Sequence, residues 1–144
     1  MRGSKKVSGT VTVPTTPAID PAANGVRILV QTAAGAPVAD VTVPGGPPWT
    51  QGATSSVYRN PSGYQGITRV IVKKIVKTPG QLRFVVVGRG MTLAVTPASL
   101  PLRATLVIDV PNASTGQCGE ATFPGPAPAP HCAFSGSGKT AFCR

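Results

Sequence analysis

A run of β-branched residues around a strong turn signal constrains the fold of this chain more than any other feature. The run is Ile67 to Gly90, ITRVIVKKIVKTPGQLRFVVVGRG. In its middle, Thr78-Pro79-Gly80-Gln81 has type II turn chemistry, because proline presets φ at the second position and glycine tolerates positive φ at the third. Apolar runs on both sides of the turn therefore predict a β-hairpin.

The register of this hairpin has consequences for its lysines. A tight turn places Ile75 opposite Phe84, and one face of the hairpin then holds Lys73 together with the apolar side chains of Ile71, Ile75, Phe84 and Val86. A lysine on a core face is unfavourable, so we expect a β-bulge at Lys73-Lys74 that turns both charges outward. A helix over the first half of the segment is the competing interpretation, but the density of β-branched residues favours strands.

The rest of the chain is a series of short alternating segments that end at turn residues. We expect further strands at residues 7–13, 25–31, 38–43, 91–96 and 103–110, a weak edge strand with a loop at 55–64, and two short strands in the tail at 133–134 and 140–143. Alternation places Val26, Ile28 and Val30 on one face of their strand, and Ala104, Leu106 and Ile108 on one face of theirs. The 17 glycines and 16 prolines among 144 residues suit turns and disfavour helices. With the two hairpin strands, and without the two short ones of the tail, this makes about eight strands and no convincing helix. The sequence therefore predicts an all-β fold, a single antiparallel sandwich or barrel-like domain.

Composition divides the chain into three parts. Residues 1–24 hold a short basic start, one alternating segment and a turn-rich linker, so we expect an N-terminal arm outside the compact body. Residues 25–111 are expected to form the β core. Residues 112–144 contain all three cysteines and the only histidine, and we expect this tail to be stapled by a disulfide and to pack on the core.

Charge is strongly unbalanced, with 14 basic residues against 4 acidic ones and a net charge of +10. A surface of one sign attracts nucleic acid, anionic lipid or acidic polysaccharide. The hairpin segment carries the candidates for contact with such a polyanion, which are Arg69, Lys73, Lys74, Lys77, Arg83 and Arg89. Its one aromatic residue is expected in the core, so nucleic acid would be bound through phosphates alone.

Catalytic and metal chemistry find little support in the residue inventory. The only acidic residues are Asp20, Asp40, Asp109 and Glu120, and sites for calcium or magnesium need several oxygen ligands. A pair of catalytic carboxylates could come only from Asp109 and Glu120. The GKT sequence near the C-terminus lacks the first glycine and the following helix of a phosphate-binding loop. We therefore expect no enzymatic activity and no cofactor.

The three cysteines, Cys118, Cys132 and Cys143, have no C-x-x-C spacing. In an exported protein they would form one disulfide and leave one thiol, which could pair with another subunit. Cys118–Cys132 is the preferred pair because the Pro-Ala loop between them can close, and Cys132–Cys143 is the alternative. A zinc site from these cysteines and His131 is disfavoured, because adjacent residues rarely both reach one tetrahedral ion.

The tail also carries a distinctive string, namely TLVID, TGQCGEA, a Pro-Ala stretch ending in a cysteine, and a last cysteine near the terminus. With the preceding TPG and LRFVVVGRG, it resembles the C-terminal module of uncharacterised exported β-rich proteins of environmental bacteria. The resemblance covers the C-terminal half of the chain well. It implies an extracellular or cell-surface location and no particular activity. The basic start has no apolar stretch behind it, so we expect no intact signal peptide, and no run reaches the length of a transmembrane helix.

These features together predict a non-enzymatic extracellular structural or self-associating module, such as a subunit of a surface filament or shell. The N-terminal arm would add to a neighbour's sheet edge through Val7, Val11 and Val13. A polyanion-binding module that uses the hairpin at residues 67–90 is the alternative. A viral-type capsid subunit is a further alternative, since a basic arm and a β body would occur together there.

Overall fold

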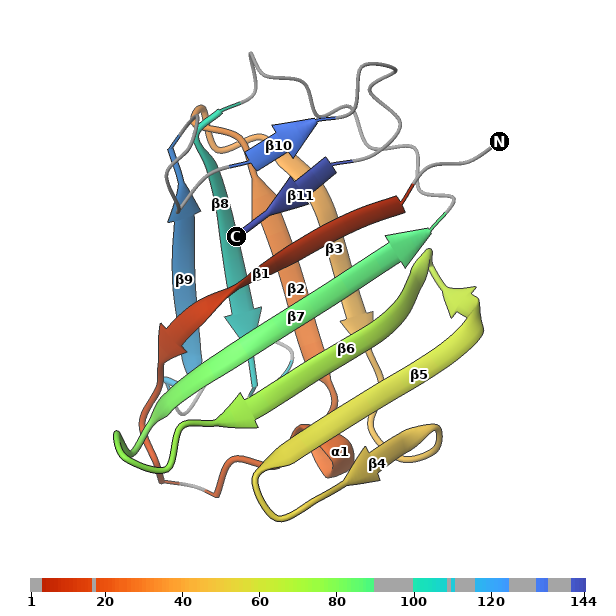
Figure 1. Cartoon of the computed structure of the whole chain (residues 1–144), viewed down its shortest axis with the longest axis vertical. Coiled ribbons are helices and arrows are strands. Elements are labelled where there is room, and N and C mark those ends of the chain that lie inside the picture. The colour runs from red at the N-terminus through yellow and green to blue at the C-terminus, as the bar shows by residue number, and fades with distance from the viewer. Residues whose placement is uncertain are drawn as a thin grey trace.

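The chain folds as a sandwich of two β-sheets (Figure 1), as the alternating segments predict. The computed structural model describes residues 4–16, 18–89, 100–108, 110, 116–124, 132–134 and 141–144. The predicted strand at 91–96, Asp109 and His131 lie outside these residues. In the described part of the chain, no helix has the length and apolar character needed to cross a membrane.

Each sheet is built from segments that are far apart in the sequence. In spatial order, the larger sheet contains β10 (Cys132–Phe134), β11 (Ala141–Cys143), β1 (Ser4–Thr12), β7 (Gln81–Arg89), β6 (Ile67–Lys74), β5 (Ser55–Tyr64) and β4 (Trp49–Gln51). The smaller sheet contains β3 (Pro37–Val43), β2 (Val26–Gln31), β8 (Leu102–Val107) and β9 (Cys118–Phe123). Paired strands are antiparallel except for β1 and β11, which run parallel.

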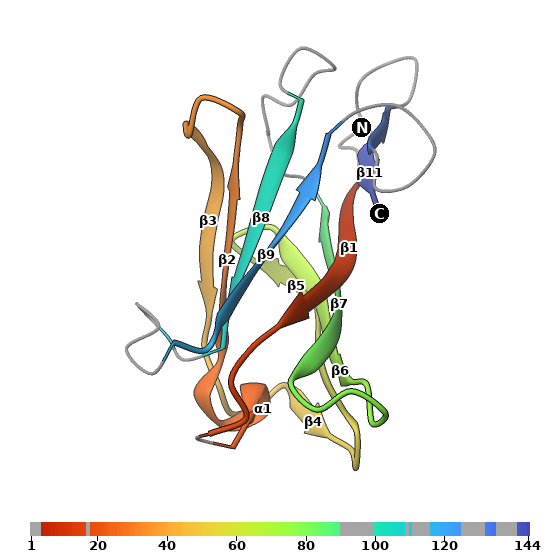
Figure 2. The same cartoon turned by 90° about the vertical axis from the view of Figure 1, so that its left-hand side faces the viewer.

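The core lies between the two sheets, which face each other in Figure 2 with the short helix α1 (Pro21–Asn24) at one end. Strands of the larger sheet cross those of the smaller one diagonally (Figure 1). The smaller sheet buries Val26, Ile28 and Val30 from β2 and Ala104, Leu106 and Ile108 from β8 and its end, as the alternation predicts. The larger sheet buries Tyr58, Val70, Val72, Leu82, Phe84 and Val86.

The β6–β7 hairpin forms, but in a different register from the predicted one. The connection contains two successive turns, in which the Thr78 N–H donates to the Ile75 carbonyl at 3.0 Å and the Gln81 N–H to the Thr78 carbonyl at 3.0 Å. Gly80 has the positive φ, 85°, that the predicted turn requires. The longer connection pairs Val72, and not Ile75, with Phe84.

This register exchanges the two faces of β6. The pairing of β6 with β7 is shifted by three residues from the predicted one. Because three is odd, every side chain of β6 lies on the face opposite to the predicted one. Val70 and Val72 face the core, and Lys73 is exposed on the outer side without any bulge. The predicted bulge at Lys73-Lys74 is therefore wrong. The ladder is instead irregular between Ile67 and Arg69, at the other end of the strand.

The N-terminal segment is a strand of the larger sheet and not an arm outside the body. β1 pairs with β7 along its whole length on one side and with β11 on the other. The predicted apolar face is present, but it contacts the protein's own core and not a neighbouring molecule. Val11 and Val13 are each 3% exposed, and Val7 packs against the core. Burial of these valines explains why the segment joins the sheet.

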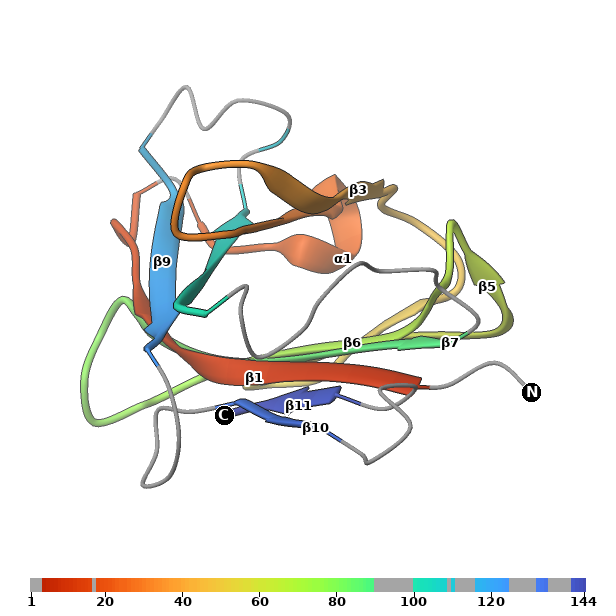
Figure 3. The same cartoon turned by 90° about the horizontal axis from the view of Figure 1, so that it is seen from above.

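Part of the tail completes the smaller sheet. β9 was not expected, because CGEATF has few β-branched residues, yet it pairs with β8 along six positions. It passes beside β1 at the edge of the sandwich (Figure 3). At Gly119 the two strands are so close that there is no room for a side chain. A Cβ atom at Gly119 would lie 2.6 Å from the Cβ of Val11. β1 and β9 can therefore approach each other this closely because residue 119 is a glycine, which has no side chain.

The rest of the described tail extends the larger sheet through a disulfide-linked pair of strands. Cys132 and Cys143 face each other across β10 and β11, with Cα atoms 4.1 Å apart, and they form the disulfide. The preferred Cys118–Cys132 pairing is wrong, and the alternative is confirmed. Cys118 lies at the start of β9 in the other sheet, with an exposed free thiol. β9 and β10 therefore belong to different sheets.

Candidate anion-binding surface

The side of the larger sheet that faces away from the core concentrates the positive charge of the molecule. We call this surface the outer face. It carries the exposed basic side chains Lys6 from β1, Arg59 from β5, Arg69 and Lys73 from β6, and Arg83 and Arg89 from β7. These residues alternate along their strands with buried apolar residues, so burying one set of side chains forces the other set outward.

Cross-strand register arranges the outer face into rows that run across the strands. The first basic row consists of Lys6, Arg69 and Arg59. Val87 lies between Lys6 and Arg69, and Arg89 lies two residues further along β7. The aliphatic row consists of Val85, Ile71 and Val57. The second basic row consists of Arg83 and Lys73. Because a strand rises about 3.3 Å per residue, successive rows lie about 7 Å apart and the two basic rows about 13 Å apart.

Two directly opposed pairs on this face carry like charges. Arg59 lies opposite Arg69 across β5 and β6, and Lys73 lies opposite Arg83 across β6 and β7. Like charges in directly opposed positions destabilise a sheet by a few tenths of a kcal/mol to about 1 kcal/mol. Within the described residues, neither pair has a carboxylate partner that would offset the repulsion.

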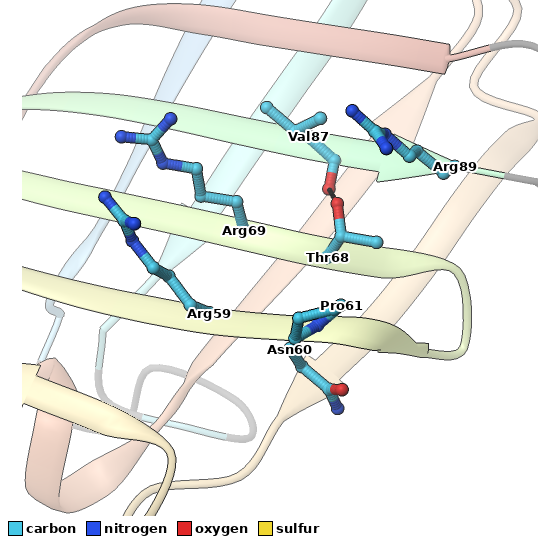
Figure 4. Close-up of a pocket in the computed structure, with 7 residues that line it drawn as sticks. All are labelled: Arg59, Asn60, Pro61, Thr68, Arg69, Val87 and Arg89. Atoms are coloured by element: carbon cyan, nitrogen blue, oxygen red, sulfur yellow. Dashed lines mark hydrogen bonds between the residues drawn. The ribbon is translucent and has the colours of Figure 1, made fainter.

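The outer face is hollowed in two places beside the arginines. Arg59, Asn60, Thr68, Arg69 and Arg89 surround an open hollow of about 290 Å³ at the first basic row (Figure 4). The Thr68 hydroxyl donates to the Val87 carbonyl at 3.3 Å, which holds it on this side of the sheet. A second hollow of about 360 Å³ continues the aliphatic row past Val57 and is lined by Thr50, Gly52, Ser55, Val57 and Arg59.

The described acidic side chains all lie away from the outer face. Asp20 caps α1 by accepting from the Ala23 N–H. On the smaller sheet, Arg27 donates to Asp40 at 2.8 and 2.7 Å, and this hydrogen bonding lowers the pKa of the Asp40 carboxyl. Glu120, on β9, lies 4.0 Å from Arg103. The smaller sheet is therefore close to neutral locally, while the outer face is uniformly positive.

The fold separates the six basic residues of the hairpin that the sequence singled out. Arg69, Lys73, Arg83 and Arg89 share the outer face. Lys74 has the opposite strand parity and lines a different hollow, together with Ile75, Val76 and Pro79. Lys77 lies in the connection after β6, away from the rows. These two lysines therefore belong to another part of the surface.

Two further cations of the outer face were missed in the sequence. Arg59 follows the alternating buried residues Ser56 and Tyr58 in β5, and Lys6 alternates with Val7 in β1. The alternation within each of these segments is visible in the sequence. Arg59 and Lys6 lie close to the hairpin only because β5 and β1 pair with its two strands in the same sheet. A sequence scan limited to the hairpin could not show that pairing.

The other predicted sites are changed by the fold. Val7, Val11 and Val13 face the interior and are not available for contact with a neighbour in this structure. The zinc site that the sequence disfavours would need all three cysteines as ligands, whereas Cys132 and Cys143 are joined to each other. In the described ranges, no three residues of the His, Cys, Asp or Glu type cluster closely enough to hold a metal ion.

By its fold and surface, the chain is a two-sheet β-sandwich domain with one strongly basic sheet face. Comparisons with known protein families, with curated proteins and with solved structures find no match for this chain. The chemistry of the outer face therefore carries the functional assignment.

Proposed function

We propose that this chain is a non-enzymatic extracellular module that binds acidic polymers through the outer face. The observation that carries the proposal is the gathering of six exposed cations from four neighbouring strands on one sheet face. No described acidic side chain lies on that face. A flat array of unneutralised cations attracts and orients a polyanion, and the affinity of such binding falls as the salt concentration rises.

The like-charge pairs give this proposal a physical basis. Arg59 with Arg69, and Lys73 with Arg83, repel each other in the free protein. An anionic group placed between the members of a pair removes the repulsion and adds charge-assisted hydrogen bonds. A local arrangement that opposes stability and favours ligand binding is typical of a functional site.

An extracellular location is supported by the chemistry of the tail. The Cys132–Cys143 disulfide suits an oxidising compartment, where such bonds form and persist. The resemblance of the tail to a module of exported proteins points to the same location. The chain has only four acidic residues, which supports a binding role over acid–base catalysis.

Charge reversal at Arg59 separates stability from binding. Arg59→Glu creates an opposite-charge pair with Arg69, so we expect the free energy of unfolding to rise by about 0.5–1 kcal/mol. Retention on a heparin column should fall, because the change removes an attractive charge and introduces a repulsive one. Denaturant unfolding and the salt concentration at elution measure the two effects.

Lys77→Glu is the matched control, since it makes the same change of charge away from the outer face. We expect its elution to shift much less than that of Arg59→Glu. Equal shifts for the two variants would mean that net charge alone governs retention, and the outer face would then not be a binding surface.

Self-association as a structural module is a second candidate function, and the free Cys118 favours it. Its thiol is exposed at the first residue of β9, the outermost strand of the smaller sheet. An odd cysteine in an exported protein commonly pairs between subunits. Donation of β1 to a neighbour has less support, because β1 is paired on both sides within its own chain.

A covalent dimer is the expected product of this second candidate. Under non-reducing conditions, the wild-type protein should show twice the monomer mass, and Cys118→Ser should remain monomeric. Because Cys118 is exposed and outside the disulfide, the substitution should change the free energy of unfolding by no more than about 0.5 kcal/mol. A wild-type protein that stays monomeric in oxidising buffer contradicts the candidate.

A further inference from the structure

Building on the proposed function, we propose that the ligand is an acidic polysaccharide. Its chain lies along the aliphatic row, across the strands, and its carboxylate or sulfate groups reach the basic rows on both sides. Val85, Ile71 and Val57 form the floor of this path. The first basic row lies about 7 Å to one side of the floor and the second about 7 Å to the other.

The banding of charge is the first observation behind this inference. The cations are not spread evenly over the outer face, since Ile71 separates Arg69 from Lys73 on β6, and Val85 and Val87 separate Arg83 from Arg89 on β7. A polyanion bound by charge alone needs no aliphatic floor. A polymer of sugar acids has both parts, because its rings present C–H groups while its charged substituents project sideways. The row from Val85 to Val57 crosses two steps between neighbouring strands, about 10 Å, and Thr50 on β4 adds a third step to about 14 Å, enough for a short stretch of such a chain.

Hydroxyl-bearing side chains around the floor provide the second observation. Ser8 and Thr10 on β1, Ser55 on β5 and Thr50 on β4 occupy outer-face positions at the ends of the aliphatic and second basic rows. Hydroxyl groups both donate and accept hydrogen bonds, which suits the hydroxyl groups of a sugar. The hollow lined by Thr50, Gly52 and Ser55 extends the floor toward the edge strand β4.

The position of the aromatic residues argues against a single-stranded nucleic acid. Bases bind such surfaces by stacking on exposed aromatic rings among the cations. Among the described side chains, the aromatic residues of the larger sheet are on its inner side or packed against the core, and they are Trp49, Tyr58, Tyr64 and Phe84. On β1, β7, β6 and β5, the strands that carry the rows, a nucleic acid would therefore gain phosphate contacts but no stacking.

Three double variants test the path. Arg59→Gln/Arg69→Gln removes two charges from the first basic row, and Lys73→Gln/Arg83→Gln removes the second row. Ile71→Thr/Val85→Thr changes the floor without changing charge, and threonine keeps the β-branched shape that favours a strand. Lys74→Gln/Lys77→Gln is the control, because it makes the same change of charge off the outer face. Thermal unfolding confirms that each variant is folded before binding is measured.

The probes are heparin, inorganic polyphosphate and single-stranded DNA, each titrated at several salt concentrations. For heparin, the logarithm of affinity falls with the logarithm of salt concentration. Each charge variant should make this slope shallower by about 1 to 2, whereas the control should change it little. The floor variant should weaken heparin binding by about tenfold with an unchanged slope, because it removes apolar contacts only. It should leave polyphosphate binding unaltered, since that polymer has no sugar ring.

The outcomes separate this inference from the proposed function. If the floor variant binds heparin as the wild type does while the charge variants are impaired, the outer face binds polyanions but the polysaccharide path is wrong. If DNA binds more tightly than heparin at equal charge and the floor variant affects both equally, the ligand class is wrong. If the control loses as much affinity as the charge variants, the proposed function itself fails.

Discussion

Replacing Gly119 with valine should lower the free energy of unfolding by about 2–3 kcal/mol, the range for overpacking a closely fitted site. The first atom of any side chain at this position would lie 2.6 Å from the Cβ of Val11, closer than carbon atoms approach in folded proteins. Val11 is 3% exposed and belongs to a strand paired along its whole length, so it cannot move away freely. The two sheets must separate at the β1–β9 edge to accommodate the change.

Gly52→Ala is a suitable control for this prediction. A Cβ atom there would meet only the Ser55 carbonyl at 3.3 Å and hydroxyl at 3.4 Å, in a surface turn. We expect a change in unfolding free energy of less than about 1 kcal/mol, measured by urea denaturation. A Gly119→Val protein as stable as the control would show that β1 and β9 do not pack closely.

Removing the disulfide with Cys132→Ala/Cys143→Ala is expected to lower the free energy of unfolding by about 3 kcal/mol, given a sequence separation of 11 residues. The bond restricts the unfolded chain, and its loss also leaves β10 and β11 held mainly by main-chain pairing with each other and with β1. Three residues in each strand are too few to remain paired without support.

The loss should be concentrated at one edge of the larger sheet. Hydrogen exchange of the double variant should accelerate first in β10 and β11, while β6 and β7 keep their protection. Wild-type protein under a reducing agent should behave in the same way. Uniform acceleration across both sheets would indicate that the disulfide supports the whole fold and not this edge alone.

Much of the fold could be predicted because the chain alternates clearly where it is buried on one side. Val26, Ile28 and Val30 lie on the core face of β2, and Ala104, Leu106 and Ile108 lie on that of β8 and its end, as predicted. The alternation is a local property, set by the geometry of a strand and the burial of every second residue. Tertiary context did not change it.

Predictions that depended on connection length or partner choice were less successful. The face of Lys73 was assigned wrongly, because the number of residues in the β6–β7 connection decides which face each residue occupies. β9 was missed since its pairing with β8 stabilises a sequence of modest strand propensity. The Cys118–Cys132 pairing failed because loop closure says nothing about which sheet each cysteine joins.

The candidate site shows the same division. The all-β class, the excess of positive charge and the basic character of the hairpin are properties that local sequence is enough to predict. Strand pairing in the folded chain sets the remaining features: Arg59 and Lys6 share a row with Arg69, Lys74 and Lys77 lie elsewhere, and charge is banded on one face. The physical reason is that alternation along a strand is encoded locally, whereas the alignment of neighbouring strands follows from burial of residues that are distant in the chain.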